Sequence, residues 1–235
     1  MTKFSLIIPC FNEQQNLKKL IIECKKIVKK NIEIILVNNG STDDSLKVLK
    51  KLIPDHNSYL KFVNIKVNKG YGHGILFGLK KAKGDILGWT HADLQTHPKD
   101  VLKGLEYFKK NKSEKIFVKG QRRNRGFFDN FFSIGMSFFE TILFQKIFHE
   151  INAQPNLFSR AFYSSWKHPP NDFSLDLYVY YKAKKDNLVI KRFNVYFHDR
   201  LFGESKWNTS FLNRLKFIKR TMSFSLKLRF KNDYN

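Results

Sequence analysis

Short apolar runs and longer periodic segments alternate along the first half of the chain. Five runs rich in apolar and β-branched side chains predict strands. They are residues 3–9, 32–37, 61–67, 86–89 and 115–119. Between them, apolar residues recur at helical spacing over residues 16–30, 43–53, 73–83 and 98–110. This alternation predicts βαβ units and an α/β fold with a mostly parallel sheet flanked by helices.

The pattern changes after about residue 126. Residues 127–148 are rich in aromatic side chains and predict one or two amphipathic helices. Helical spacing returns over residues 174–186 and 211–229, and residues 188–196 predict a strand. Neither an internal repeat nor a low-complexity linker separates the two halves, so we expect a single domain.

Polar side chains and glycines gather in the turns that follow the first four predicted strands. The turns read Pro9-Cys10-Phe11-Asn12-Glu13, Asn38-Asn39-Gly40-Ser41-Thr42-Asp43-Asp44, Asn68-Lys69-Gly70-Tyr71-Gly72-His73-Gly74 and His91-Ala92-Asp93-Leu94-Gln95-Thr96-His97-Pro98. Parallel sheets bind ligands beyond the carboxyl ends of their strands, so these turns form the candidate site.

Each turn also has a simpler interpretation. Asn12 suits a helix cap, and the glycines of the third turn suit a plain tight turn as well as close approach of a ligand. Asp93 is more informative, because a carboxylate at the end of a buried strand can hold a divalent cation that bridges phosphates. His91 and His97 give weaker support to a zinc site.

Composition narrows the class of protein. The chain has 235 residues, 42% of them hydrophobic and 15% aromatic, which is typical of a folded domain. Its two cysteines are too few for a disulfide framework, so we expect a reducing, cytoplasmic environment. The sequence predicts neither a signal peptide nor a membrane-spanning helix.

The charge points to anionic partners. Lys and Arg number 43 against 20 Asp and Glu, a formal charge of +23. Phosphate-bearing substrates, an acidic membrane surface and nucleic acid all fit this excess, and so does a general compositional bias toward Lys, Asn, Ile and Phe. No helix-turn-helix, zinc-finger or RNP motif supports nucleic acid, so we expect no nucleic-acid partner.

Taken in order, the four turns resemble the family 2 glycosyltransferases of GT-A fold, closest to the dolichyl-phosphate mannosyltransferase-like branch. The likeness covers residues 3–110 and resumes at Arg200-Leu201-Phe202-Gly203-Glu204-Ser205-Lys206, which is similar to the Arg-x-x-Gly-Glu-Ser-Lys segment of that branch. The resemblance implies a nucleotide-sugar-binding α/β portion over residues 1–120. It implies an acceptor-side, membrane-proximal portion of the same domain over residues 121–235.

The resemblance also implies roles for individual residues. The donor nucleotide and sugar are expected to contact Pro9, Phe11, Glu13, Asn39, Asp43, Gly70, Tyr71, His91 and Gln95. Asp93 is expected to hold Mg²⁺ or Mn²⁺, and Arg200 and Lys206 to neutralise charge on the leaving diphosphate.

The acceptor determines what else the reaction needs. A hydroxyl acceptor requires a general base, for which Asp172 and Asp176 are the candidates, although Asp172 also suits a helix cap. A phosphate acceptor is already ionised, and Arg122, Arg123, Arg125 and Ser205 would then bind it.

The sequence therefore predicts an inverting, metal-dependent glycosyltransferase. Its expected donor is a nucleotide-diphosphate sugar, and its expected acceptor is a lipid-linked phosphate or a cell-surface glycan. The aromatic 127–148 segment and the basic 211–229 helix favour peripheral attachment to an anionic inner membrane surface, although burial explains the first equally well. A nucleotidyltransferase is the alternative enzyme, and a basic nucleic-acid-binding protein is a weaker one. The sequence does not indicate an oligomeric state.

Overall fold

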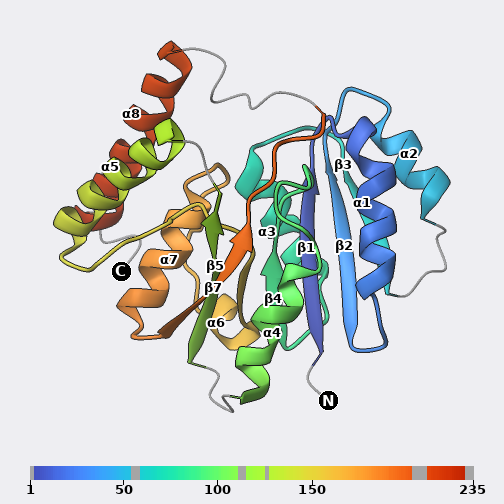
Figure 1. The fold of residues 1–235 in the computed structure, drawn as a ribbon, viewed down its shortest axis with the longest axis horizontal. Helices are drawn as coiled ribbons and strands as arrows, with labels where there is room; N and C mark the ends of the chain where they lie inside the picture. The colour runs from blue at the N-terminus through green and yellow to red at the C-terminus, as the bar shows by residue number, and fades with distance from the viewer. Residues whose placement is uncertain (1–2, 54–58, 111–114, 125–126, 203–210, 231–235) are drawn as a thin grey trace.

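A computed structural model describes residues 3–53, 59–110, 115–124, 127–202 and 211–230 (Figure 1). Seven strands form one sheet in the order β3-β2-β1-β4-β6-β5-β7. The strands are β1 (Phe4–Cys10), β2 (Ile32–Asn39), β3 (Leu60–Ile65), β4 (Ile86–Trp89), β5 (Ile116–Arg123), β6 (Asn156–Ser159) and β7 (Val189–Tyr196). Of these seven, only β6 runs antiparallel to its neighbours, β4 and β5. The carboxyl ends of the other six strands therefore share one edge of the sheet.

Helices cover both faces of this sheet. They are α1 (Gln14–Ile27), α2 (Ser45–Leu52), α3 (Tyr71–Lys81), α4 (Asp100–Lys110), α5 (Phe127–Phe144), α6 (Arg160–Ser164), α7 (Leu175–Lys185) and α8 (Phe211–Phe230). Buried side chains of α1, α2 and α4 form one core layer, and those of α3, α6 and α7 form the other. The predicted α/β architecture, a mostly parallel sheet flanked by helices, is thus confirmed.

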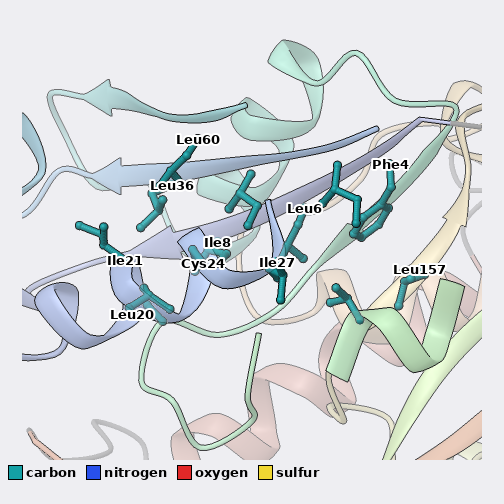
Figure 2. Close-up of a cluster of buried hydrophobic side chains, with 14 of the residues drawn as sticks. Phe4, Leu6, Ile8, Leu20, Ile21, Cys24, Ile27, Leu36, Leu60 and Leu157 are labelled. Atoms are coloured by element: carbon teal, nitrogen blue, oxygen red, sulfur yellow. The ribbon is translucent and has the colours of Figure 1, made fainter. Parts of the chain in front are cut away.

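The central strand shows why its sequence reads as an unbroken apolar run. Leu6 and Ile8 of β1 point into the layer beneath α1, where they meet Leu20 and Cys24 (Figure 2). Ile7, between them, points into the opposite layer beneath α3. A strand covered on both faces buries both sets of alternating side chains, so it loses the polar positions of a half-exposed strand.

The helices α5 and α8 lie side by side at one end of the molecule, beyond β5 and α7 (Figure 1). We call them the α5–α8 pair. Phe144 anchors this pair to the core, with its ring 4.5 Å from that of Tyr181 on α7. Leu228 of α8 joins the same buried layer. Among the described helices, none is both long enough and apolar enough to cross a bilayer.

Candidate active site

The first two turns of the candidate site are tied to each other. Asn12, with φ of 58°, accepts a hydrogen bond from the Thr42 backbone N–H through Oδ1 at 2.8 Å. Asp43 Oδ2 accepts from the Gln14 backbone N–H at 3.2 Å, and Asp43 Oδ1 accepts from that of Ser45 at 2.9 Å. Both Asp43 oxygens therefore bind backbone that starts a helix. Asp43 fixes the shape of these two turns, and its contact with base or ribose stays a prediction.

The third turn is packed against the backbone of residues 170–172. A Cβ added to Gly70 would lie 2.3 Å from the Asn171 carbonyl oxygen, and one added to Gly72 would lie 2.5 Å from that of Pro170. The His73 backbone N–H donates to Asn171 O at 2.8 Å. The glycines thus make room for the chain's own backbone. The sequence pattern alone leaves open whether ligand or protein fills that space.

Asn39 connects the second turn to the third. Its Nδ2 donates to the Gly70 carbonyl at 2.9 Å, while its buried Oδ1 has no hydrogen-bond partner among the described residues. An unpaired buried acceptor is costly, so a ligand N–H at this position would be stabilising. The same holds for Oδ1 of Asn38, whose Nδ2 donates to Asn64 at 2.6 Å.

The fourth turn presents Asp93 beyond the end of β4. The Gln95 backbone N–H donates to Asp93 Oδ1 at 3.1 Å, and the Arg200 guanidinium pairs with Oδ2 at 2.7 Å. Leu94, next to Asp93, has φ of 59°, a left-handed conformation that non-glycine residues rarely adopt. Such strain is tolerated where the surroundings fix it, and it is frequent at functional sites.

Residues 197–202, which we call the crossing segment, extend from β7 along this edge of the sheet. The Phe197 N–H donates to Arg123 O at 3.0 Å, and His198 N–H donates to Gln95 O at 2.9 Å. Its far end reaches α1, where Asn16 Nδ2 donates to Phe202 O at 3.4 Å. The crossing segment therefore brings Arg200 to Asp93, and Figure 1 shows the chain leaving β7 along this path.

Glu13 lies in the electrostatic field of the same group. Burial raises its pKa, and the charges of Asp93 and Asp43 raise it further. The hydrogen bond from Asn16, at 2.6 Å, and the charge of Arg200 oppose this rise. The structure thus brings together Glu13, Asp43, Asp93 and Arg200, which come from four separate parts of the chain.

A second polar cluster surrounds Asp176 on α7. Asp176 is buried, and its Oδ1 accepts hydrogen bonds from Gln154 at 2.8 Å, Asn156 at 3.0 Å and Trp89 at 3.3 Å. Burial raises the pKa of Asp176, and the nearby Lys119 and His91 oppose that rise. With three donors on one oxygen, Asp176 holds α7 to the adjoining ends of β4 and β6.

Tyr71 joins the two clusters. Its ring stacks on Phe173 with centroids 4.7 Å apart, and lies 5.8 Å from the ring of His91. Its hydroxyl accepts from Gln154 Nε2 at 3.3 Å. Burial, followed by the charge of Asp176, raises the Tyr71 pKa well above its usual value. Tyr71 therefore stays a neutral phenol at neutral pH.

Lys119 on β5 completes the Asp176 cluster. Its ammonium is buried and donates to the Ala153 carbonyl at 2.7 Å and to Asn156 Oδ1 at 2.8 Å. Burial lowers its pKa to about 7, although the charge of Asp176 opposes the shift. Sequence reasoning misses Lys119, Gln154 and Asn156, since their contacts depend on β6, which the sequence pattern does not predict.

The remaining predicted residues lie elsewhere or have other partners. Asp172 Oδ1 accepts from the Ser174 N–H at 2.9 Å, and Oδ2 lies 3.6 Å from Arg220 Nε. Arg122 pairs with Glu150 at 2.7 Å, and Arg123 donates to Asn194 at 2.9 Å. Pro9 and Phe11 flank the start of the first turn and are partly buried. Arg125, Ser205 and Lys206 lie outside the described residues.

The donor set fits one kind of cation. The part of the chain that the structure describes has no group of three His, Cys, Asp or Glu that could hold a metal ion by itself. Mg²⁺ and Mn²⁺ are commonly held by one or two carboxylates together with substrate phosphates and water. Asp93 suits that arrangement, whereas a structural zinc site would need four protein ligands. His97 instead pairs with Glu23 at 2.9 Å.

Comparison with known proteins places these turns in a family. The family model described as "Glycosyl transferase family 2" matches residues 5–169. Undecaprenyl-phosphate 4-deoxy-4-formamido-L-arabinose transferase of Pectobacterium atrosepticum is 36% identical over 44% of this chain and 32% of its own length. The Pseudomonas savastanoi protein of that name is 35% identical over 41% and 30%. The chain thus matches about a third of the length of these curated relatives.

Solved structures share the fold over nearly the whole chain. Glucosyl-3-phosphoglycerate synthase from Mycobacterium tuberculosis, in complex with Mn²⁺, UDP-glucose and phosphoglyceric acid, superposes with a TM-score of 0.75 at 18% identity. The alignment covers 97% of this chain and 79% of that one. The same enzyme with Mn²⁺, UDP and glucosyl-3-phosphoglycerate gives a TM-score of 0.71 at 19% identity, covering 97% and 80%. At this identity the likeness shows the fold.

Proposed function

The chain belongs to glycosyl transferase family 2, and on that premise we propose that it transfers a sugar from a nucleotide-diphosphate sugar to a lipid-linked phosphate, with inversion at the anomeric carbon. In this reaction an acceptor oxygen forms a bond to the anomeric carbon. The bond between that carbon and the donor diphosphate breaks, and the nucleoside diphosphate leaves. The transition state combines an oxocarbenium-like sugar with growing negative charge on the diphosphate.

The observation that carries this proposal is the Asp93–Arg200 pair at the carboxyl edge of the sheet. A buried carboxylate and a guanidinium 2.7 Å apart provide one group for a cation and one for phosphate oxygens. When bound, Mg²⁺ or Mn²⁺ would act as a Lewis acid that stabilises the leaving diphosphate. The Mycobacterium tuberculosis enzyme of the same fold was solved with Mn²⁺ and a UDP-sugar, which supports this choice of ligands.

The chain's own groups then have distinct tasks in the proposal. The turns held by Asn12 and Asp43 bind the nucleoside, and the unpaired Asn39 Oδ1 accepts an N–H from the donor. Arg200 shifts part of its interaction from Asp93 to the diphosphate as the donor binds. Gln95, held to the crossing segment at His198, contacts the sugar beside Asp93.

The hydrogen bonds of Asp172 and Asp176 favour a phosphate acceptor over a hydroxyl acceptor. Asp176 Oδ1 already accepts three hydrogen bonds, and Asp172 binds the backbone just before α7. Neither arrangement favours a free general base, and an ionised phosphate needs none. The names of the relatives, which specify undecaprenyl phosphate, agree with a lipid-linked phosphate as the acceptor. We propose a cell-surface glycan on a lipid carrier as the second acceptor to test.

Because such an acceptor is anchored in a bilayer, we propose that the chain works as a peripheral protein at the cytoplasmic face of a membrane. Arg122 and Arg123 end β5 at the same edge as Asp93, which keeps them candidates for acceptor-phosphate contacts. Arg122 would have to share its charge with Glu150. Arg123 would have to exchange its bond to Asn194 for one to phosphate.

A thermal-shift screen tests the donor half of this proposal. Nucleoside diphosphates with Mn²⁺ should raise the melting temperature by several degrees at saturation, because they bind the native state. EDTA should remove most of that shift. A protein stabilised only by nucleoside triphosphates, and releasing pyrophosphate with a sugar phosphate, would instead be a nucleotidyltransferase. The absence of any shift with every nucleotide would contradict both enzyme assignments.

A further inference from the structure

The helix α5 carries apolar side chains on two different faces. One face is buried, because Phe144 packs against Tyr181 of α7. Phe148, just beyond the end of α5, packs against Tyr180 of the same helix. Ser225 of α8 closes this face by donating to Glu140 Oε1 at 2.5 Å. These contacts fix the rotation of α5 about its axis. They therefore fix which side chains point away from the protein.

The opposite face of α5 forms an exposed apolar ridge. Ile134, Phe138 and Ile142 are 63%, 67% and 62% exposed. They are spaced four residues apart, so they lie in one row about 12 Å long on the helix surface. A Cβ added to Gly135, beside them, would meet no described atom within 4 Å, so this side of the helix is open. Large apolar side chains grouped in this way mark an interaction surface.

Residues 134–146, which carry this ridge, expose charge of one sign only. Over residues 134–146 the one acidic residue, Glu140, is buried, and Lys146 is exposed. Residues 211–230 of α8 contain no Asp or Glu. The exposed cations of the described part of α8 include Lys216, Lys219, Lys227 and Arg229. Over residues 134–146 and 211–230 the one carboxylate, Glu140, is buried, so the charges that these two stretches expose are cationic.

We propose that the α5–α8 pair binds an anionic bilayer, with the Ile134–Phe138–Ile142 ridge inserted among the lipids and the α8 cations at their headgroups. Apolar insertion and electrostatic attraction together give stable peripheral binding, which neither supplies as well alone. The proposal rests on the proposed function, because membrane binding would bring the transferase to its lipid-linked acceptor. The binding itself does not depend on catalysis.

Charge decides between a membrane and a second copy of the chain. Two copies meeting through this surface would bring together molecules of formal charge +23 each, so their long-range electrostatics oppose association. An anionic bilayer has the opposite sign, and its fluid apolar interior accepts a row of side chains without a complementary groove. The observations therefore favour lipid.

Vesicle co-sedimentation tests the surface with three matched sets of substitutions in the full chain. The ridge variant combines Ile134→Ser, Phe138→Ser and Ile142→Ser, which removes apolar groups and leaves the charge unchanged. The cation variant combines Lys216→Gln, Lys219→Gln and Lys227→Gln. The control variant combines Lys18→Gln, Lys47→Gln and Lys50→Gln, the same charge change on exposed positions of α1 and α2, at the opposite end of the molecule. The vesicles are phosphatidylcholine with or without phosphatidylglycerol.

The three sets should separate the two contributions. At low salt on phosphatidylglycerol vesicles, the cation variant should bind roughly a hundredfold more weakly than wild type, and the control should bind nearly as wild type does. At high salt, where charges are screened, the ridge variant should bind the vesicles at least about tenfold more weakly than wild type does. Circular dichroism checks that each variant is folded.

Two results would overturn the proposal. One is equal vesicle binding by folded ridge, cation and control variants. The other is a wild-type protein that ignores phosphatidylglycerol vesicles but sediments as a dimer that the ridge substitutions dissociate, which would identify a second copy as the occupant. In either case, transfer from a nucleotide sugar by wild type in detergent solution would leave the transferase assignment intact. Conversely, a wild-type protein that binds vesicles as predicted but transfers no sugar would support the membrane surface and contradict the transferase assignment.

Discussion

Arg200 reaches Asp93 across 107 positions of sequence, and it occupies the carboxylate that the proposed cation needs. The guanidinium competes with any cation for Asp93 Oδ2, so Arg200→Ala should tighten Mn²⁺ binding in the absence of nucleotide. The same variant should lose kcat/KM by an amount worth roughly 1.5–3 kcal/mol, because the diphosphate loses a charged partner. Titration calorimetry with Mn²⁺ and steady-state kinetics measure the two effects.

Arg123→Ala, which removes a bond to Asn194 instead, is the control for Mn²⁺ binding. If Arg200→Ala weakens Mn²⁺ binding as much as it lowers kcat/KM, the arginine supports the cation and does not compete with it. Unchanged kinetics would assign Arg200 to structure alone. Both outcomes differ from the predicted one, in which affinity for the cation rises while turnover falls.

The Glu140 carboxyl is buried between α5 and α8. Burial raises its pKa to about 7, and the hydrogen bond from Ser225 only partly opposes this. Between the unfolded pKa of about 4.5 and the folded value near 7, the native state binds a proton that the unfolded chain has lost, so stability falls as pH rises through this window. Glu140→Gln should remove this contribution to the fall and stabilise the protein at pH 8 by on the order of 3 kcal/mol.

Urea denaturation of wild type and Glu140→Gln at about pH 5 and pH 8 measures this difference. Glu106→Gln, on the exposed surface of α4, should show no comparable gain. A wild-type and a Glu140→Gln protein of equal stability at the higher pH would show that the carboxylate is better solvated or better paired than its contacts indicate.

Single residues also show where sequence reasoning stops. Asp93 is predictable because a carboxylate that follows an apolar run is visible in the sequence, and Arg200 because its segment is similar to a family pattern. Lys119, Gln154 and Asn156 are not. A lysine in a short apolar run gives no sign of its direction, and only the fold shows that Lys119 points to carbonyl and amide oxygens inside the protein.

At the scale of elements, the third turn depends on contact with residues 170–172. The Gly72→Ala side chain would lie 2.5 Å from the Pro170 carbonyl oxygen and 2.8 Å from that of Asp172, so backbone must move to admit it. We expect a loss of roughly 1–3 kcal/mol of stability, and weaker nucleotide binding because Tyr71 would shift with the turn. Gly135→Ala, in an open position of α5, should be neutral or slightly stabilising.

Thermal unfolding of Gly72→Ala and Gly135→Ala, with and without a nucleoside diphosphate, measures both effects. The lower melting temperature and the smaller ligand-induced shift should both belong to Gly72→Ala. If that protein melts and binds nucleotide as wild type does, the third turn is not held by residues 170–172.

Most elements are predictable from periodicity, because β1, β2 and β4 are mostly apolar and the helices around them have one apolar face. The strand β6 cannot be predicted in this way, since the four residues Asn156–Ser159 are too few to show the alternation of a strand. Its place between β4 and β5 reverses one strand direction in the sheet. Periodicity therefore predicts the layers correctly and leaves the middle of the sheet incomplete.

In the whole molecule, the proposed donor site and the α5–α8 pair belong to one folded unit. The donor site lies at the carboxyl edge of the sheet, and the pair packs on the helical layer that covers one face of that sheet. The division into portions 1–120 and 121–235 stays a prediction, since β5 (Ile116–Arg123) spans that boundary and lies in the same sheet as β1. The formal charge of +23 fits a protein that handles phosphates beside an anionic surface.

The proposed metal-dependent transfer is tested most directly by comparing wild type with Asp93→Asn. A labelled nucleotide-diphosphate sugar, chosen by the thermal-shift screen, is incubated with Mn²⁺ and undecaprenyl phosphate, and the lipid product is quantified after extraction. We expect labelled lipid from wild type and its loss in excess EDTA. A folded Asp93→Asn protein should be at least about a hundredfold slower, because the amide neither carries the charge nor binds the cation as a carboxylate does. Wild-type rates from Asp93→Asn, or from wild type in EDTA, would contradict the proposed function.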